Sequence, residues 1–502
     1  MDILKGRTRA DKTKALAEFA AEFAAEAIPG DVIHDAKRLL LDGLGCALGG
    51  FTLSAGRITI EGFGRWRSGQ GVGATVVGDG WRMPSDHAAY LNARLGNLMD
   101  MDEVLLNIGH LSPAVHWSAL ALAEEENVSG AELLTAFTLG FEVGARVFLA
   151  LGTIFEIEEG RAIPADTTGF GHAVVGGAAA CGRVLRLSGE HMVHALALGA
   201  MHTPAPLSHN SVTNMSMAKY QMDSAASGAV KGAVLAAAGQ TGPDAILDDD
   251  GYARAMARKS FNADVLTDGL GTIWHLGVTS IKTFPHCRHT HYALGLVCRL
   301  VREEKLRPEE IEGIHVRGFS SFAVPPWNNY EPRDAFDLQF SLPFGIALAA
   351  AGVPPGPEWM KPEHLRASQI RDLARRVTSE AHPDIQERLR AAWPEPLKEV
   401  PTEVSISARG RIFTAADHFA PGDGFASTHR LDDAAVIEKF RRNAEAVLPS
   451  ATVDELIDAV FRIDELESLS ELTQLMIVPV AITNQMQLGP NWRDLNLSST
   501  NQ

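Results

Sequence analysis

Hydrophobic residues recur every three or four positions through most of the first half of the chain, which is the spacing of amphipathic helices. In residues 31–50 the apolar positions form one stripe; Asp31 can cap its start, and the closing glycines can end it. Ser129 and Glu132 have capping-box spacing immediately before another apolar stretch. The pattern therefore predicts a large all-helical domain.

Two helical segments, residues 174–185 and 224–239, are rich in glycine and alanine. Because small residues let helices approach closely, we expect both segments in the centre of a helical bundle. The alternative is a loosely packed, alanine-rich helix on the surface.

The hydrophobic period changes near residue 279. Residues 312–319 alternate with the period of a strand, and residues 403–419 do so on both sides of Arg409 and Gly410, which predicts a hairpin. Helical stretches at 294–304 and 344–351 lie between these strands. This part of the chain is expected to be a smaller α+β domain.

Helical periodicity returns after Asp432 and continues to about residue 486. The fold is therefore predicted to be mainly α, with a small α+β domain inserted before the C-terminal helices. We expect the all-helical domain to comprise residues 1–278 and 432–486, the α+β domain residues 279–431, and a polar, frayed tail residues 487–502.

Composition narrows the class of protein. The 502 residues carry a formal net charge of −17, which argues against a general nucleic-acid binder. Four cysteines without a CxxC pair favour a reducing compartment. The sequence shows no signal-peptide pattern and no run of about 18 apolar residues. These features predict a cytoplasmic protein that does not enter a membrane.

An acidic stretch contains Asp100, Asp102 and Glu103, followed by His110. A buried acid near a histidine suits general acid–base chemistry. If these acids lie on a helix, they point to different faces, so only some of them can share a site with His110. The alternative is a helix C-terminus with solvated acids.

The stretch SIKTFPHCRHTH, residues 280–291, is rich in basic residues although the chain is acidic. Its histidines and cysteine fit no usual zinc spacing, and Lys282 and Arg288 would repel a metal cation. Lysine, arginine and histidine together suit a carboxylate ligand. The stretch predicts an anion site, and a polar loop at a domain junction is the alternative. His172 precedes a Gly/Ala-rich helix, where packing is the alternative role.

The order of motifs resembles the MmgE/PrpD family. LLLDGLGCALGG is followed by LNARLGNLMDMDE, the Gly/Ala-rich helix, IKTFPHCRHTH and QFSLPFGIALA. The resemblance covers residues 12–480 approximately and implies a helical domain, a smaller lid domain and a homodimer. It also implies a small polycarboxylate substrate bound between the domains, with no metal and no organic cofactor.

The resemblance assigns roles residue by residue. His110, Lys282 and Asp100 are the expected catalytic residues. The expected substrate-binding residues are Lys219, Arg288, His291, Asp102, His172 and Thr167. Three polar residues of the family pattern are replaced here by Val104, Thr167 and Phe344, and losing a polar contact to substrate is not neutral. The replacements point to a less polar substrate or a related reaction with another acid.

The reactions of this family begin at a carbon next to a carboxylate, where fixed cations stabilise the developing negative charge. The resemblance therefore implies a cofactor-independent lyase, most similar to 2-methylcitrate dehydratase. An epimerase or isomerase and a decarboxylase are the alternatives. The last alternative is a binding protein without catalytic activity.

Overall fold

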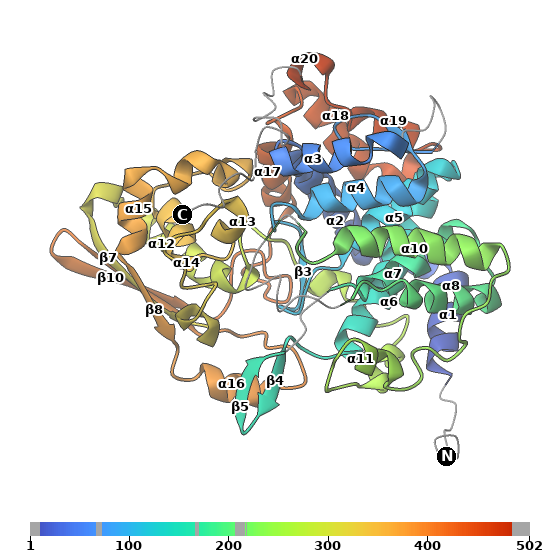
Figure 1. Ribbon diagram of the computed structural model, residues 1–502, viewed down its shortest axis with the longest axis horizontal. Coiled ribbons are helices and arrows are strands. Elements are labelled where there is room, and N and C mark those ends of the chain that lie inside the picture. The colour runs from blue at the N-terminus through green and yellow to red at the C-terminus, as the bar shows by residue number, and fades with distance from the viewer. Residues whose placement is uncertain (1–10, 67–72, 166–169, 206–215, 217, 484–502) are drawn as a thin grey trace, which may run out of the picture.

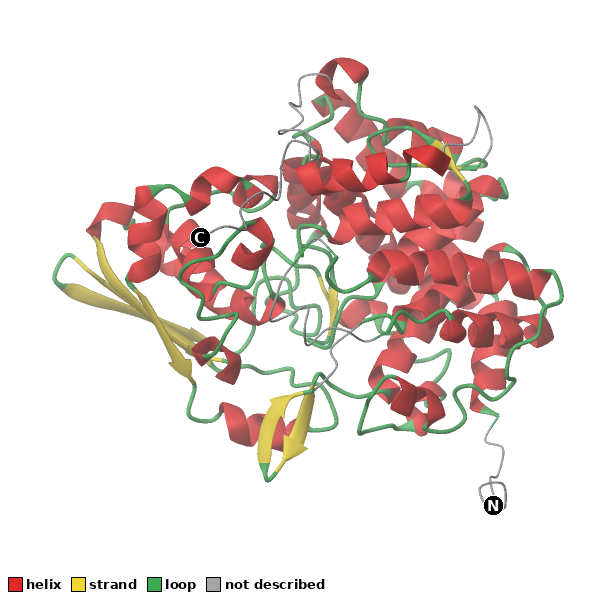
Figure 2. Cartoon of the chain, in the orientation of Figure 1, coloured by secondary structure: helices red, strands yellow, loops and turns green. Residues whose placement is uncertain are grey.

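The computed structural model describes residues 11–66, 73–165, 170–205, 216 and 218–483. The predicted tail and Thr167 lie outside these residues. The chain is mainly α-helical, with a small β-sheet (Figures 1 and 2). Figure 1 shows most helices gathered on one side, the sheet and its own helices on the other, and the short strand β3 between them.

The first group of helices includes those expected from hydrophobic periodicity. The predicted helix at 31–50 is α2, Gly30–Phe51. The helices of this group are α1 Lys12–Glu22, α2, α3 Ser54–Gly62, α4 Ser85–Asn97, α5 Ser112–Glu125, α6 Gly130–Ala150, α7 Ala173–Val184, α8 Gly189–Met201, α10 Met222–Ala237, α11 Gly251–Ala255, α17 Asp433–Ala444, α18 Ser450–Phe461, α19 Ser470–Leu475 and α20 Val480–Thr483.

The predicted capping box is present at the start of α6. The backbone N–H of Glu132 donates to the Ser129 hydroxyl at 3.3 Å, and the Ser129 N–H donates to the Glu132 carboxylate at 3.1 Å. α6 is long and apolar enough to cross a membrane, yet nearly all of it is buried inside the protein. Its composition is that of a core helix.

The two Gly/Ala-rich segments are α7 and α10, and they pack together in the centre of the bundle as predicted. A Cβ atom on Gly176 of α7 would lie 2.7 Å from the carbonyl oxygen of Gly140 and 2.8 Å from the Cα of Gly144, both on α6. Only glycine allows this approach, because any side chain would push α6 and α7 apart.

The sheet has the strand order β10-β9-β7-β8, with β7 and β8 parallel and the other pairs antiparallel. Its strands are β7 Ile311–Gly318, β8 Val377–Ala381, β9 Thr402–Ala408 and β10 Arg411–Asp417. Arg409 and Gly410 form the predicted hairpin turn, both with positive φ, 55° and 65°. The helices of the same part of the chain are α12 His291–Glu303, α13 Ala335–Leu338, α14 Leu342–Ala350, α15 Ser368–Arg375 and α16 Ile385–Ala392, of which α12, α14 and α15 contact the sheet.

Buried hydrophobic residues of the described ranges form two large clusters. The first joins the N-terminal helices to residues of α17, α18 and α19, such as Phe440 and Leu472. The second lies between the sheet and α12, α14 and α15. The C-terminal helices thus return to the core of the N-terminal helices, although the exact domain boundaries stay a prediction.

The expectation of an all-helical first part is wrong for several short segments. β4 Phe155–Glu158 and β5 Arg161–Pro164 form a hairpin that turns at Glu159 and Gly160. Phe155 of this hairpin belongs to the second hydrophobic cluster, so its burial stabilises the hairpin. The other short strands of this part are β1 Ala74–Thr75, β2 Arg82–Met83 and β3 Val104–Leu105. β6 Thr279–Ser280 lies at the start of the predicted α+β domain.

Candidate active site

The acidic stretch forms a buried loop between α4 and α5 and is not the solvated end of a helix. Asp100 has a left-handed backbone conformation, φ 52°, which turns the chain away from α4. β3 then pairs antiparallel with β6, with Val104 opposite Ser280. This two-residue ladder holds the acidic loop against the basic stretch that follows β6.

His110 lies between two carboxylates. Its Nδ1 is 2.6 Å from Asp102 and its Nε2 is 3.1 Å from Asp100, and all three side chains are buried. The expectation that only some of the acids could share a site with His110 assumed a helix, and the loop removes that restriction. Burial disfavours the imidazolium, but Asp102 and then Asp100 outweigh burial and raise the pKa of His110 to about 9.

Two ammonium groups neutralise Asp100. Lys282 Nζ lies 2.8 Å from one carboxylate oxygen, and Lys219 Nζ lies 3.8 Å from the other. Burial would raise the pKa of Asp100, but the charges of Lys219 and Lys282 hold it well below its usual range. Burial in turn lowers the pKa of Lys219 to about 8. Lys282 and His110 therefore meet at the same carboxylate, as the sequence led us to expect.

Glu103 has a different position from the other acids. Its carboxylate accepts the backbone N–H groups of Leu111 at 2.8 Å and Ser112 at 2.5 Å, at the start of α5. Burial, assisted by the charge of Asp102, raises the pKa of Glu103 to about 8. Glu103 thus anchors the loop to α5, and it is protonated at neutral pH.

Glu103 makes the stability of the protein depend on pH. The folded chain keeps the proton to about pH 8, whereas the unfolded chain releases it near the usual pKa of 4.5. The folded state therefore binds more protons between these values, and the free energy of unfolding falls as pH rises through this window. Glu103→Gln, which cannot titrate, should reduce this fall, as measured by urea unfolding at pH 5.0, 5.5, 6.0 and 6.5.

Measuring below pH 6.5 separates the effect of Glu103 from that of His110. The pKa of His110 rises from 6.5 to about 9 on folding, so its contribution to stability changes at higher pH. Glu358→Gln, at a half-exposed carboxylate, is the matched control and should keep the wild-type slope. An unchanged slope in Glu103→Gln would contradict the raised pKa.

Sequence reasoning missed several residues that hold the cluster. Gln339, from the QFSLPF motif, accepts from Lys219 and donates to the Leu98 carbonyl at 2.8 Å. Lys439 of α17 lies 2.5 Å from Asp42 and donates to the Met101 carbonyl at 2.7 Å, within the acidic loop. Gln339 lies between Leu338 and Phe340 in the sequence, and a polar residue in such surroundings is a weak signal; Lys439 lies in a charged stretch that offers none.

A cavity of about 180 Å³ lies beside the cluster and is lined from both parts of the fold. His110 and Arg288 of the predicted residues line it, while the carboxylate and ammonium groups around His110 lie behind that ring. Tyr220, another missed residue, stacks on His110 with ring centroids 5.1 Å apart and has φ 62°. Burial raises the pKa of Tyr220 well above its usual value, so its phenol stays protonated.

The other predicted substrate-binding residues that the structure describes also make contacts within the fold. Arg288 forms a buried ion pair with Asp423. His291 contacts the His286 carbonyl at 3.0 Å, and burial holds the pKa of His291 well below its usual value. His172 packs against Phe148, with ring centroids 3.9 Å apart. Neither histidine belongs to the cavity wall.

The three family polar positions that differ here have different surroundings. Val104 lines the cavity, so the missing hydroxyl would have faced it. Phe344, in the first turn of α14, packs in the second hydrophobic cluster and not in the cavity wall. Thr167 lies outside the described residues. Of the two changes that can be located, only Val104 alters the cavity.

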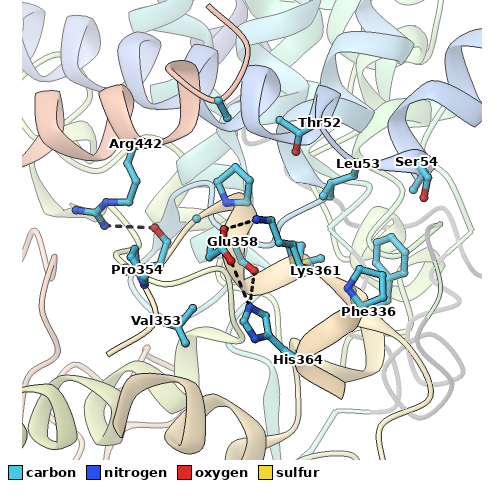
Figure 3. Close-up of a pocket in the computed structure, with 18 of the residues that line it drawn as sticks. Thr52, Leu53, Ser54, Phe336, Val353, Pro354, Glu358, Lys361, His364 and Arg442 are labelled. Atoms are coloured by element: carbon cyan, nitrogen blue, oxygen red, sulfur yellow. Dashed lines mark hydrogen bonds and ion pairs between the residues drawn. The ribbon is translucent and has the colours of Figure 1, made fainter. Parts of the chain in front are cut away.

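A larger pocket lies elsewhere. It measures about 970 Å³ and is shown in Figure 3, between residues 52–55, the loop 353–358 and α17. Three of its side chains pair with one another: Lys361 lies 2.6 Å and His364 3.6 Å from the Glu358 carboxylate (Figure 3). It contains none of the residues predicted to be catalytic.

Asp100, Asp102 and His110 also offer three ligand atoms within 4.8 Å of one another, an arrangement that can hold a metal ion. Two ammonium groups already lie against Asp100, however, and their charges would repel a metal cation. Both ring nitrogens of His110 face carboxylates. The donor set therefore favours an acid–base cluster over a metal centre.

Fold and site together define a mainly helical protein with a buried acid–base cluster beside a small cavity. The chain belongs to the MmgE/PrpD family, because residues 14–263 match the MmgE/PrpD N-terminal domain and residues 284–463 match the MmgE/PrpD C-terminal domain. The resemblance seen in the motifs is confirmed.

Three curated relatives are named cis-aconitate decarboxylase. The protein of Homo sapiens is 28% identical over 467 residues, which cover 89% of this chain and 91% of the human one. That of Mus musculus is 27% identical over 468 residues, with 89% and 90% covered. That of Aspergillus terreus is 22% identical over 499 residues, with 93% and 96% covered. These similarities support an enzyme, and they favour the decarboxylase alternative over the dehydratase.

Proposed function

We propose that the protein is a cofactor-independent decarboxylase of a small unsaturated carboxylate. The observation that carries the proposal is the sharing of Asp100 among Lys282, Lys219 and His110, directly beside the cavity. This cluster offers both a fixed positive charge and a transferable proton, and the relatives named cis-aconitate decarboxylase support this reaction type.

The reaction needs a carboxymethyl group next to a carbon–carbon double bond that is conjugated with a second carboxylate. The bond to the departing carboxylate breaks, and its electron pair forms a new double bond. The pair of the old double bond moves to the carbon beside the retained carboxylate, and that carbon takes one proton while carbon dioxide leaves. Lys282 and Lys219 stabilise the charge that develops on the retained carboxylate.

His110 is the proposed proton donor. Its imidazolium carries the proton at neutral pH, since the pKa of His110 is about 9. A rotation of the ring about its contact with Asp102 would direct the Nε2–H from Asp100 toward the substrate carbon, and the two lysines would keep the Asp100 charge compensated during this step. Asp102 holds Nδ1 and so orients the ring.

Carbon dioxide release from cis-aconitate tests the proposal. In deuterium oxide the purified protein should release one carbon dioxide per product and place one deuterium on the product carbon. A dehydratase would add or eliminate water without releasing carbon dioxide, and an epimerase would incorporate deuterium without elimination. Failure to release carbon dioxide from cis-aconitate and from related unsaturated dicarboxylates would contradict the decarboxylase.

Other features stay predictions. A lid function for the sheet-containing part, a homodimer and a cytoplasmic location follow only from the sequence. A lid would fit the cavity wall, because residues from both parts of the fold contribute to it.

A further inference from the structure

The charges around the cavity leave a single positive charge without a partner in the described part of the chain. Among the residues that the structure describes, Lys282, Lys219 and the His110 imidazolium face two carboxylates, those of Asp100 and Asp102. Burial keeps the Glu103 carboxyl protonated at neutral pH by raising its pKa to about 8. One buried positive charge is matched by one ligand carboxylate, because unpaired buried charge is costly.

The neighbouring cations add no net positive charge, although the Nε–H of Arg288, in the cavity wall, has no hydrogen-bond partner among the described residues and can bind a ligand oxygen. Arg288 is paired with Asp423, and the carbonyl of Pro421 also lies within reach of its guanidinium at 3.4 Å. Lys439 is paired with Asp42. Both ion pairs are buried, so neither cation can leave its partner for a substrate without leaving a buried carboxylate unpaired.

Much of the cavity wall is aromatic. Its polar residues Asn107 and Ser321 are uncharged, and burial lowers the pKa of His289 to about 4, so His289 is neutral as well. Phe155, Phe170, Trp327 and Phe340 contribute rings, and all four are buried. The Cys287 thiol in this wall accepts the Trp327 indole N–H at 3.4 Å, and burial raises its pKa to about 11, so it is neutral. A further substrate carboxylate against these rings would lose its hydration without gaining an ionic partner there.

We propose that the substrate is a glutaconate, an unsaturated five-carbon dicarboxylate, that carries an alkyl group on carbon 3. The retained carboxylate pairs with the Lys282–His110 cluster, and the alkyl group lies on the ring wall. The carboxymethyl carboxylate remains without a cation and leaves as neutral carbon dioxide, which an apolar site favours. This inference rests on the proposed decarboxylase and names its substrate class.

The step balances without another reactant. The bond between carbon 4 and its carboxylate breaks, a double bond forms between carbons 3 and 4, and carbon 2 accepts one proton from His110. The product is a 3-alkylbut-3-enoate, and solvent returns the proton to His110. A third carboxylate on carbon 3, as in cis-aconitate, takes no part in this electron flow. The small cavity volume limits the alkyl group to a few carbons.

The test compares cis-aconitate with 3-methylglutaconate and 3-propylglutaconate, each as both geometric isomers, by carbon dioxide release and by calorimetric binding. We expect kcat/KM for the better alkyl compound to exceed that for cis-aconitate by at least about tenfold, the effect of one unpaired buried charge. Higher kcat/KM for cis-aconitate would overturn the substrate class and leave the decarboxylase intact.

If no compound releases carbon dioxide, the decarboxylase fails and binding alone decides the substrate class. Tighter binding of an alkylglutaconate than of cis-aconitate would still support it, and the reverse order would overturn it.

A cation placed in the wall supplies a second test. Val324 lines the cavity and is 47% exposed, so Val324→Arg should fold. It should move the kcat/KM ratio toward cis-aconitate by about threefold to fivefold, the effect of a partly exposed ion pair. Val234→Arg, on α10 at 44% exposure and outside the cavity wall, is the matched control and should keep the wild-type ratio. Equal kcat/KM ratios in both variants would contradict the placement of the substrate's alkyl group against this wall.

Discussion

Lys282→Met is expected to lower kcat/KM for decarboxylation by about 10²–10³, which is typical for removing one fixed charge from the site where charge develops. Lys282 is fully buried, and its ammonium lies 2.8 Å from Asp100, behind the His110 ring that lines the cavity. Methionine keeps the length and the packing of the side chain but cannot stabilise a carboxylate. Steady-state release of carbon dioxide measures the effect.

The same variant should also lose stability, because it leaves Asp100 buried with less compensation. Removing one partner of a buried ion pair typically costs about 3–5 kcal/mol. The double variant Lys282→Met/Asp100→Asn removes both charges and should regain most of this loss in urea unfolding. It should stay inactive, however, since the substrate carboxylate still lacks its cation.

These two variants separate catalysis from folding. If the double variant regained activity together with stability, Lys282 would serve only to neutralise Asp100. Lys361→Met is the matched control, at a half-exposed lysine in the larger pocket of Figure 3, paired with Glu358. It should leave kcat/KM unchanged.

The sequence predicted the helices and the hairpin at Arg409 well, because buried faces impose a regular period on the residues that cover them. It did not predict the hairpin of β4 and β5, although Phe155 and Ile157 alternate with Glu156 and Glu158. An alternation over only four residues is too short to stand out within a part of the chain that is otherwise helical. The strand partners β3 and β6 have two residues each, which is too short for any period to show.

For the site, residue chemistry predicted which groups belong together but not how they meet. Lys282, Asp100 and His110 were expected in one place, and they share one carboxylate oxygen. The left-handed turn at Asp100 lets both Asp100 and Asp102 reach His110, and no helical spacing shows such a turn. Tyr220 carries no motif of its own, and its role depends on stacking, which the sequence does not encode locally.

His110→Gln is expected to lower kcat/KM by about 10²–10⁴, the range for loss of a general acid. Glutamine can still accept and donate hydrogen bonds between Asp100 and Asp102, but it has no proton to transfer at neutral pH. Deuterium incorporation during residual turnover should then lose its dependence on pH near 9. Undiminished activity would remove His110 from the proposed mechanism.

Asp102→Asn tests the same proton donor by changing the pKa of His110. Asp102 contributes most to raising the pKa of His110, so its loss should shift the alkaline limb of kcat/KM to lower pH by about 1–3 units. Asn97→Ala removes only the hydrogen bonds of 2.9 and 3.1 Å that an uncharged amide donates to Asp102. It should leave the alkaline limb of kcat/KM nearly in place.

Stability and activity must be read at different pH values in this experiment. The raised pKa of His110 contributes stability that is fully present below about pH 6.5 and is lost as pH rises through about 9. Asp102→Asn should therefore cost most stability at low pH, where the wild type benefits fully, and less near pH 9. A limb that stays at its wild-type position, in a variant whose stability has lost this pH dependence, would show that a group other than His110 donates the proton. Lys219, with its pKa of about 8, would be the first candidate.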